Sequence, residues 1–430
     1  MRYLVLVIFS FFIISCGGGS SSEYLEYDDN KIVENTNITT VNEPVLDQLN
    51  SLRKSSGLIE FKNNDKLEIA AYNHALYIAT TRIVDHYESD QYSNFTGVTP
   101  SDRAIYAGFK STIIGENLSD GQRNEYFSLK GLMSAIYHRF GFLNFDKNII
   151  GYGKENLSYV YDMGNSDLNN LCYGENYSGD NPYYISVCTD SSFKIEVSLY
   201  KNELNKTINA NPSYVIFPYK NQINVTTSFY EESPDPLPYY NVSGYPISIE
   251  FNKNEYNMDN FSINSFTIYD DSNNSLDLAA DFNDSSTILS SENDQNNHLS
   301  KYQFAIFPKE RLDYGKSYRV EFKYIYNNES KDIIWEFTTE NLNNLIVYDG
   351  NDVNISISNN YNLYVKPRNV NDIYHSTYLS CTYTGSQSPL SLEFYDKNTF
   401  NLTTNSSTGS CTLTLNKDES NENNITININ

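Results

Sequence analysis

Asp85-His86-Tyr87, Gly115-Glu116-Asn117-Leu118 and Ile136-Tyr137-His138-Arg139 are the three stretches that decide the predicted fold of the first half of this chain. Together they supply two imidazoles and one carboxylate, each beside a segment of helical character. Imidazole nitrogens and a carboxylate oxygen suit a divalent metal, and the same groups serve as acid and base without one. The sequence therefore predicts a candidate metal or acid/base site.

Helical and strand patterns surround these stretches. Apolar residues at helical spacing predict helices over 44–54 and 63–82. His74 lies on the apolar stripe of the second helix, which favours a core histidine over a ligand. Thr99-Pro100-Ser101-Asp102 is typical of a capped helix start, and a further helix is expected from Phe127 to near His138. We expect Gly115 to Leu118 to form a loop, and 149–153 and 157–161 to form strands.

The order of these motifs resembles a known family. It comprises Leu-Asn-x-x-Arg at 49–53, Ala-Ala before His74, an isolated His86, Gly-Glu-Asn, Tyr-His-Arg, and Ile-Gly-Tyr-Gly at 150–153. This order is similar to the CAP superfamily, also called the SCP or pathogenesis-related-1-like domain, in its bacterial secreted branch. The resemblance covers roughly residues 45–197, and it implies an α+β domain at 42–200, built as a CAP-type α-β-α sandwich. Leu132 and Ala135-Ile136-Tyr137 depart from the family pattern, and Glu125 is the nearest acid to the family's second glutamate.

The resemblance implies that His86, Glu116 and His138 line one cavity. His86 would follow a helix, Glu116 would lie on a loop and His138 at a helix end, together holding Zn²⁺ or another divalent metal. A metal-bound water would make such a site hydrolytic. The alternative is a buried hydrogen-bonded network that holds loops together. We expect a non-catalytic binding, adhesion or envelope-interaction role, with a metal-dependent hydrolase as the alternative. Whether the protein is an enzyme stays open.

The N-terminus predicts export. Met1-Arg2 precedes an apolar run from Tyr3 to Ile14 that is too short to span a bilayer as a helix. The run ends in Ile13-Ile14-Ser15-Cys16, which resembles a bacterial lipobox. Residues 1–15 are therefore expected to be a lipoprotein signal peptide, Cys16 the lipidated first residue, and 16–41 a polar tether. An ordinary signal peptide with an incidental cysteine is the alternative. The expected location is the cell envelope, at the outer membrane if the cell is Gram-negative.

The other four cysteines form two close pairs. Export into an oxidising compartment permits disulfides. The pairs Cys172–Cys188 and Cys381–Cys411 are the natural assignment. Metal binding is the alternative, but no CxxC spacing is present and no histidine adjoins these cysteines.

The formal net charge is −24 over 430 residues. Such acidity argues against nucleic acid, whose phosphates would be repelled. It also leaves the lipid anchor as the expected contact with the membrane. The expected ligand is an envelope or extracellular protein, glycan or lipid.

Two all-β modules are expected after the first domain. A polar linker is predicted at 201–211, followed by Ig-like β-sandwiches at 212–341 and 342–430. Period-two alternation supports both sandwiches, as in Tyr318, Val320 and Phe322 of the first. Cys381 and Cys411 share the parity of apolar neighbours, which predicts a bridge between the two sheets of the last module.

Overall fold

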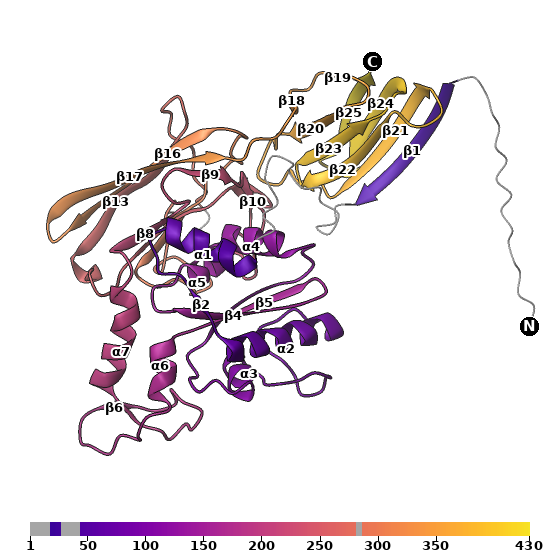
Figure 1. Cartoon of the computed structure of the whole chain (residues 1–430). Coiled ribbons are helices and arrows are strands. Elements are labelled where there is room, and N and C mark those ends of the chain that lie inside the picture. Colours follow the sequence, from indigo (N-terminus) through magenta and orange to yellow (C-terminus); the bar gives the residue numbers. More distant parts are fainter. Residues whose placement is uncertain (1–17, 27–43, 281–285) are drawn as a thin grey trace, which may run out of the picture. The chain divides into compact units, whose positions relative to one another are not determined.

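The computed structural model describes residues 18–26, 44–280 and 286–430 (Figure 1). The chain divides into two compact units. Among the described residues, one unit comprises 44–280, 286–342 and 367–373, and the other comprises 18–26, 343–366 and 374–430. The expected signal peptide, Cys16 and residues 27–41 of the expected tether lie outside the described residues. No helix of the described part is long and apolar enough to cross a membrane.

The first domain is a three-layer α-β-α sandwich, as predicted. Its sheet has the strand order β2-β4-β5-β3. Helices α2 and α3 cover one face of the sheet, and α1, α4 and α5 cover the other (Figure 1). The strands are β2 (Lys62–Asn63), β3 (Gly115–Ser119), β4 (Ile149–Glu155) and β5 (Ser158–Gly164). The helices are α1 (Val45–Ser55), α2 (Asp65–Thr81), α3 (Pro100–Tyr106), α4 (Glu125–Ser134) and α5 (Ile136–Phe142).

Local sequence explains where the helices begin and how closely they pack. Both hydrogen bonds of the predicted capping box are present at the start of α3, between Thr99 and Asp102. Glycines on β4 allow α2 to lie directly on the sheet. A Cβ atom on Gly151 would lie 2.0 Å from the backbone nitrogen of Glu68, and one on Gly153 would lie 2.1 Å from that of Tyr72. The Ile-Gly-Tyr-Gly motif is therefore a requirement of helix–sheet contact.

Two local predictions around the candidate site are wrong. Gly115–Ser119 is the edge strand β3 rather than a loop, because it pairs along its whole length with β5. The expected helix from Phe127 to His138 is two helices, because Ala135 has extended backbone angles (φ −75°, ψ 119°). His138 is thus the third residue of α5 and lies near a helix start, not at a helix end.

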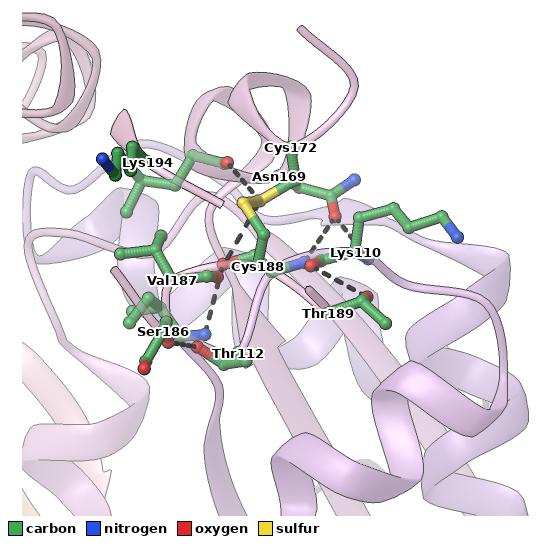
Figure 2. The surroundings of a disulfide bond; sticks show 12 residues. Lys110, Thr112, Asn169, Cys172, Ser186, Val187, Cys188, Thr189 and Lys194 are labelled. Atoms are coloured by element: carbon green, nitrogen blue, oxygen red, sulfur yellow. Dashed lines mark hydrogen bonds between the residues drawn. A yellow bond between two sulfur atoms is a disulfide. The ribbon is translucent and has the colours of Figure 1, made fainter. Parts of the chain in front are cut away.

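A disulfide-bonded segment completes the first domain. Cys172 and Cys188 form the predicted bond, and the chain around it is held by backbone hydrogen bonds (Figure 2). Thr112 N donates to Val187 O at 2.8 Å. The expected polar linker at 201–211 is largely the helix α7 instead, because Thr207 and Ile208 are buried. The elements here are α6 (Ser166–Leu171), β6 (Tyr183–Tyr184), β7 (Ile195–Glu196) and α7 (Val197–Asn209).

The next module is a two-sheet β-sandwich, and it belongs to the same compact unit as the first domain. Its sheets have the orders β14-β15-β12-β8 and β13-β16-β17-β9, and a separate ribbon pairs β10 with β11. One apolar cluster runs from α1 and α4 into both sheets of this sandwich. The strands are β8 (Tyr214–Phe217), β9 (Gln222–Val225), β10 (Ser228–Phe229), β11 (Ser243–Gly244), β12 (Ile247–Phe251), β13 (Phe261–Tyr269), β14 (Leu289–Ser290), β15 (Gln303–Ile306), β16 (Ser317–Tyr326) and β17 (Glu329–Thr339), with a 3₁₀ helix at Met258–Asn260.

The C-terminal unit is a second β-sandwich. Its sheets have the orders β1-β21-β24-β25-β19 and β18-β20-β23-β22, with an apolar core between them. The strands are β1 (Gly18–Glu26), β18 (Leu345–Tyr348), β19 (Val353–Ile355), β20 (Asn360–Val365), β21 (Ser376–Thr384), β22 (Leu390–Asp396), β23 (Thr399–Thr404), β24 (Thr408–Leu415) and β25 (Asn423–Ile429).

Two features of this unit differ from expectation. Cys381 and Cys411 are bonded as predicted, but they are directly opposite on β21 and β24, so the bond joins neighbouring strands of one sheet and not two sheets. Residues 18–26 of the expected tether form β1, which pairs antiparallel with β21 over nine positions (Figure 1). Pairing is favoured because β1 satisfies the free edge of β21 and Leu25 packs against the core.

Candidate functional site

His86 and Glu116 form the pair at the centre of the site. His86 lies in the loop after α2, and Glu116 lies on β3. Their Nδ1 and Oε1 atoms are 2.8 Å apart. The His86 side chain is 42% exposed, whereas that of Glu116 is 1% exposed. One partly exposed imidazole is thus fixed by a carboxylate beneath it.

Arg103 on α3 holds this pair from inside. Its Nη2 donates to Glu116 Oε2 at 2.6 Å, and its Nη1 donates to the backbone oxygen of His86 at 3.0 Å. Arg103 is fully buried. A buried guanidinium needs a carboxylate partner. Because its two nitrogens donate to two different segments, Arg103 fixes both the His86 loop and β3. Both Glu116 oxygens are therefore engaged.

A second buried pair lies next to the first. His74 on α2 places Nδ1 2.9 Å from Glu88 Oε1 and Nε2 2.9 Å from the backbone oxygen of Asp85. The other oxygen of Glu88 accepts from Thr96 N at 2.8 Å. His74 is a core histidine, as predicted, and its partner is Glu88. The pair fixes the loop that carries His86.

Asp162 completes the cluster from β5. It is the direct strand partner of Glu116 and is fully buried. Neither of its oxygens accepts a hydrogen bond from a described group. Burial raises the pKa of Asp162 well above its usual value, and the negative charge of Glu116 raises it further. Burial also opposes ionisation of Glu116, but its bond to His86 and the charges of Arg103 and His74 outweigh this and lower its pKa to about 2. Glu116 is therefore ionised at neutral pH, whereas burial opposes ionisation of Asp162.

His138 belongs to a different contact. Its Nδ1 lies 3.1 Å from Oε2 of Glu232, a residue of the following β-sandwich module. The Glu232 carboxylate also accepts from the backbone N–H groups of Ile136 at 2.6 Å and Tyr137 at 3.2 Å. It therefore caps the start of α5, whose own N-cap residue Ala135 has no side-chain acceptor.

Strand geometry explains why His138 does not join His86 and Glu116. Successive side chains of a strand point to opposite faces of the sheet. Glu116 points to the face covered by α2 and α3, where Arg103 meets it. Asn117 points to the other face, where its Nδ2 donates to the backbone oxygen of His138 at 2.8 Å. The prediction of a single three-residue cluster is corrected accordingly.

Further contacts attach α5 to the β-sandwich. The buried Arg139 donates from Nη1 to Pro246 O at 2.7 Å and lies over the rings of Phe217 and Tyr245. The hydroxyl of Tyr137 donates to Asp294, and burial, followed by that bond, raises the Tyr137 pKa. The Tyr-His-Arg motif, predicted as part of a metal or acid/base site, thus makes the junction between domain and sandwich.

The arrangement does not fit the predicted metal site. Among the described residues, no group of three or more His, Cys, Asp or Glu side chains is placed to hold a metal ion. The two carboxylates next to the histidines already bond to Arg103, His74, His86 and backbone N–H groups. Glu125, the nearest acid to the family's second glutamate, accepts a hydrogen bond from Lys154 at 2.9 Å instead. Metal binding itself stays a prediction.

Sequence reasoning missed the residues that hold the cluster together. Arg103, Glu88 and Asp162 lie in no motif, and Glu232 lies in another module. Arg103 carried one usable signal, since it lies four positions after the helix cap Thr99 and next to Ala104 on the buried face of α3. Glu88 also carried a signal, since it directly follows Asp85-His86-Tyr87, but the positions of Asp162 and Glu232 are found only from the folded structure.

Comparison with known proteins is consistent with this domain. The model of the Cysteine-rich secretory protein family, CAP, matches residues 46–175. No curated protein matches the chain. Among solved structures, the chain is similar to an extracellular protein containing an SCP domain from Bacillus anthracis str. Ames. The two are 19% identical over 28% of this chain and 38% of that chain, with a TM-score of 0.26.

Other solved structures overlap different parts of the chain. SGBP-B of the Bacteroides ovatus mixed-linkage glucan utilization locus is 12% identical over 51% of this chain and 48% of that chain, with a TM-score of 0.15. The titin Ig tandem domains A164-A165 are 9% identical over 50% of this chain and 96% of that chain, with a TM-score of 0.17. The matched part covers less than half the length of the Bacillus anthracis protein and of SGBP-B. The low TM-scores carry no argument about its function.

Proposed function

Because residues 46–175 form a CAP domain, we propose that the chain is a cell-envelope lipoprotein whose CAP domain binds a ligand without turnover. The lipid anchor would be at Cys16. Two disulfides support an oxidising location outside the cytoplasm. The ligand would be an envelope or extracellular protein, glycan or lipid.

One observation carries the binding role. His86 is the partly exposed member of a cluster in which the carboxylates of Glu88 and Glu116 are buried and engaged. A general base works best when its pKa lies near the working pH, and the Glu116 pKa of about 2 is far below it. Asp162, with its raised pKa, is fully buried. The cluster is therefore suited to presenting a fixed imidazole to a ligand.

Retention on envelope material tests this proposal. The full chain with Cys16→Ala removes the anchor, and it is incubated with isolated envelope glycan and, separately, with vesicles of envelope lipid. His86→Asn should reduce retention on one of these probes. His375→Asn, an exposed histidine of the other unit, is the matched control and should leave retention unchanged.

Product analysis separates binding from hydrolysis. If soluble fragments are released, and if a chelator stops their release, the protein is a metal-dependent hydrolase and the binding proposal is wrong. Equal retention of the wild type and His86→Asn on both probes would contradict the proposed binding role.

A further inference from the structure

The N-terminal strand lies next to the predicted lipid anchor in sequence. β1 begins at Gly18, two positions after Cys16, and pairs Gly18 with Thr384 at the end of β21. Two residues of extended chain reach about 7 Å at most. A lipid on Cys16 would therefore hold one end of the C-terminal sandwich within about this distance of the membrane surface.

Three loops lie at that end of the sandwich, beside Asn344, which precedes β18, and Asn430, which follows β25. Each passes from one sheet to the other: 356–359 joins β19 to β20, 385–389 joins β21 to β22, and 405–407 joins β23 to β24. They contact one another, since Ser358 N donates to Asn405 O at 2.9 Å and Asn405 N donates to Pro389 O at 3.2 Å. Their sequences are Ser-Ile-Ser-Asn, Gly-Ser-Gln-Ser-Pro and Asn-Ser-Ser. We call these three loops the uncharged end.

The opposite end of the same unit has a different composition. The hairpin turns 397–398, between β22 and β23, and 416–422, between β24 and β25, lie there. Together with Asp396, the last residue of β22, they carry Lys397, Lys417, Asp418, Glu419 and Glu422. We call these two turns the charged end. In a chain with 54 acidic and 30 basic residues, three adjoining loops without a charge form a distinct surface.

We propose that the uncharged end rests on the lipid headgroups of the membrane that holds the anchor. The proposal rests on lipidation of Cys16. Anionic headgroups give a membrane a negative surface potential, which repels carboxylates within a Debye length of about 8 Å at physiological salt. Uncharged serine and asparagine side chains avoid this repulsion and hydrogen-bond to phosphate and glycerol oxygens. Ile357 adds a 38% exposed apolar side chain at this end.

Site-specific fluorescence tests which end meets the membrane. The lipidated full-length protein is reconstituted into vesicles of phosphatidylethanolamine and phosphatidylglycerol that contain a headgroup-labelled quencher. A fluorophore is attached at Ser386→Cys or Ser406→Cys in the uncharged end, or at Ser420→Cys in the charged end. All three serines are exposed, so the variants are matched. We expect a large loss of fluorescence at Ser386→Cys and Ser406→Cys and little loss at Ser420→Cys.

The outcomes separate this inference from the proposed lipidation. Equal quenching at both ends, or stronger quenching at Ser420→Cys, would overturn the inference and leave the lipoprotein intact, provided that Cys16→Ala still releases the protein from membranes. If the Cys16→Ala variant stays on the membrane as the wild type does, both the proposed lipidation and this inference are wrong. The strand pairing is checked separately: Ser22→Cys with Ser380→Cys, which are directly opposite in register, should form a disulfide. Failure to do so would detach β1 from the sandwich and also overturn the inference.

Discussion

Two histidine–glutamate pairs of the larger unit, His86–Glu116 and His138–Glu232, have similar chemistry and different roles. His86 and Glu116 are 30 positions apart and 2.8 Å from each other within one domain. His138 and Glu232 are 94 positions apart and 3.1 Å from each other, and they join α5 to the β-sandwich. A buried guanidinium supports the first pair, and the N–H groups of a helix start support the second. The surroundings of each pair, rather than the pair itself, determine what the pair does.

Among the substitutions that test this comparison, loss of Arg103 should reduce the stability of the protein most. Arg103→Met leaves Glu116 buried without its guanidinium partner, and removing one partner of a buried ion pair costs about 3–5 kcal/mol. We expect the urea midpoint of the compact unit that holds the CAP domain to fall accordingly. The exposed Arg82→Met is the control and should change stability by less than about 0.5 kcal/mol. A small change for Arg103→Met would mean that solvent reaches the cluster.

Neutralising Glu116 should have the next largest effect and should remove a pH dependence. Its folded pKa of about 2 lies below the ordinary value of 4.5, so its stabilising contribution is present above pH 4.5 and is lost as pH falls toward 2. Glu116→Gln should reduce stability at neutral pH by about 2 kcal/mol, because Arg103 loses a charged acceptor. It should also flatten the loss of stability between pH 4.5 and 2.

Urea denaturation at a series of pH values measures this window. The exposed Glu60→Gln is the control and should keep the wild-type pH profile. Asp162 contributes to the pH dependence of stability with the opposite sign. Because its folded pKa is raised, its protonation at lower pH relieves a buried charge and favours the folded state. A Glu116→Gln profile identical in slope to the wild type would contradict the assigned ionisation of Glu116.

Glu232 tests the other pair, with a smaller expected effect. Glu232→Gln keeps an acceptor for one N–H group of α5 but removes the charge next to His138 and the helix start, at a cost of about 1–2 kcal/mol. Hydrogen exchange should rise for the α5 amides and stay unchanged for α2 and α3. The exposed Glu255→Gln is the matched control. Faster exchange in α3 would show that the two pairs are coupled.

Much of the fold was predictable because local patterns are strong. The apolar stripe of α2, the capping box of α3 and the alternation in β16 act within a few residues, and each gave the correct element. The α-β-α order followed from the resemblance, and both cysteine pairs followed from spacing. The break at Ala135 was not predictable, because the acceptor that starts α5 comes from Glu232 in another module.

The candidate site was predictable only in part, for a related reason. Glu116 and Asn117 are neighbours in sequence but face opposite layers, and this follows only when the segment is known to be a strand. Treating it as a loop removed that constraint and allowed His138 to be grouped with His86. The strand β1 was missed because its polar residues resemble a tether, and its partner residues on β21 are 350 or more positions away in sequence.

Replacing the two histidines themselves should have the smallest effect on stability and the clearest effect on function. His86→Asn removes one bond from Glu116, which keeps Arg103, so we expect a loss of at most about 1 kcal/mol for this partly exposed pair. His138→Asn should cost a similar amount, because Glu232 keeps its two helix N–H donors. The two variants should differ in retention on envelope glycan or lipid vesicles: His86→Asn should lose it, and His138→Asn, whose side chain is 14% exposed at the junction, should keep it. Retention is measured by sedimentation alongside thermal unfolding of each variant. Loss of retention by His138→Asn alone would move the binding surface from the α2–α3 side of the sheet to the junction with the β-sandwich.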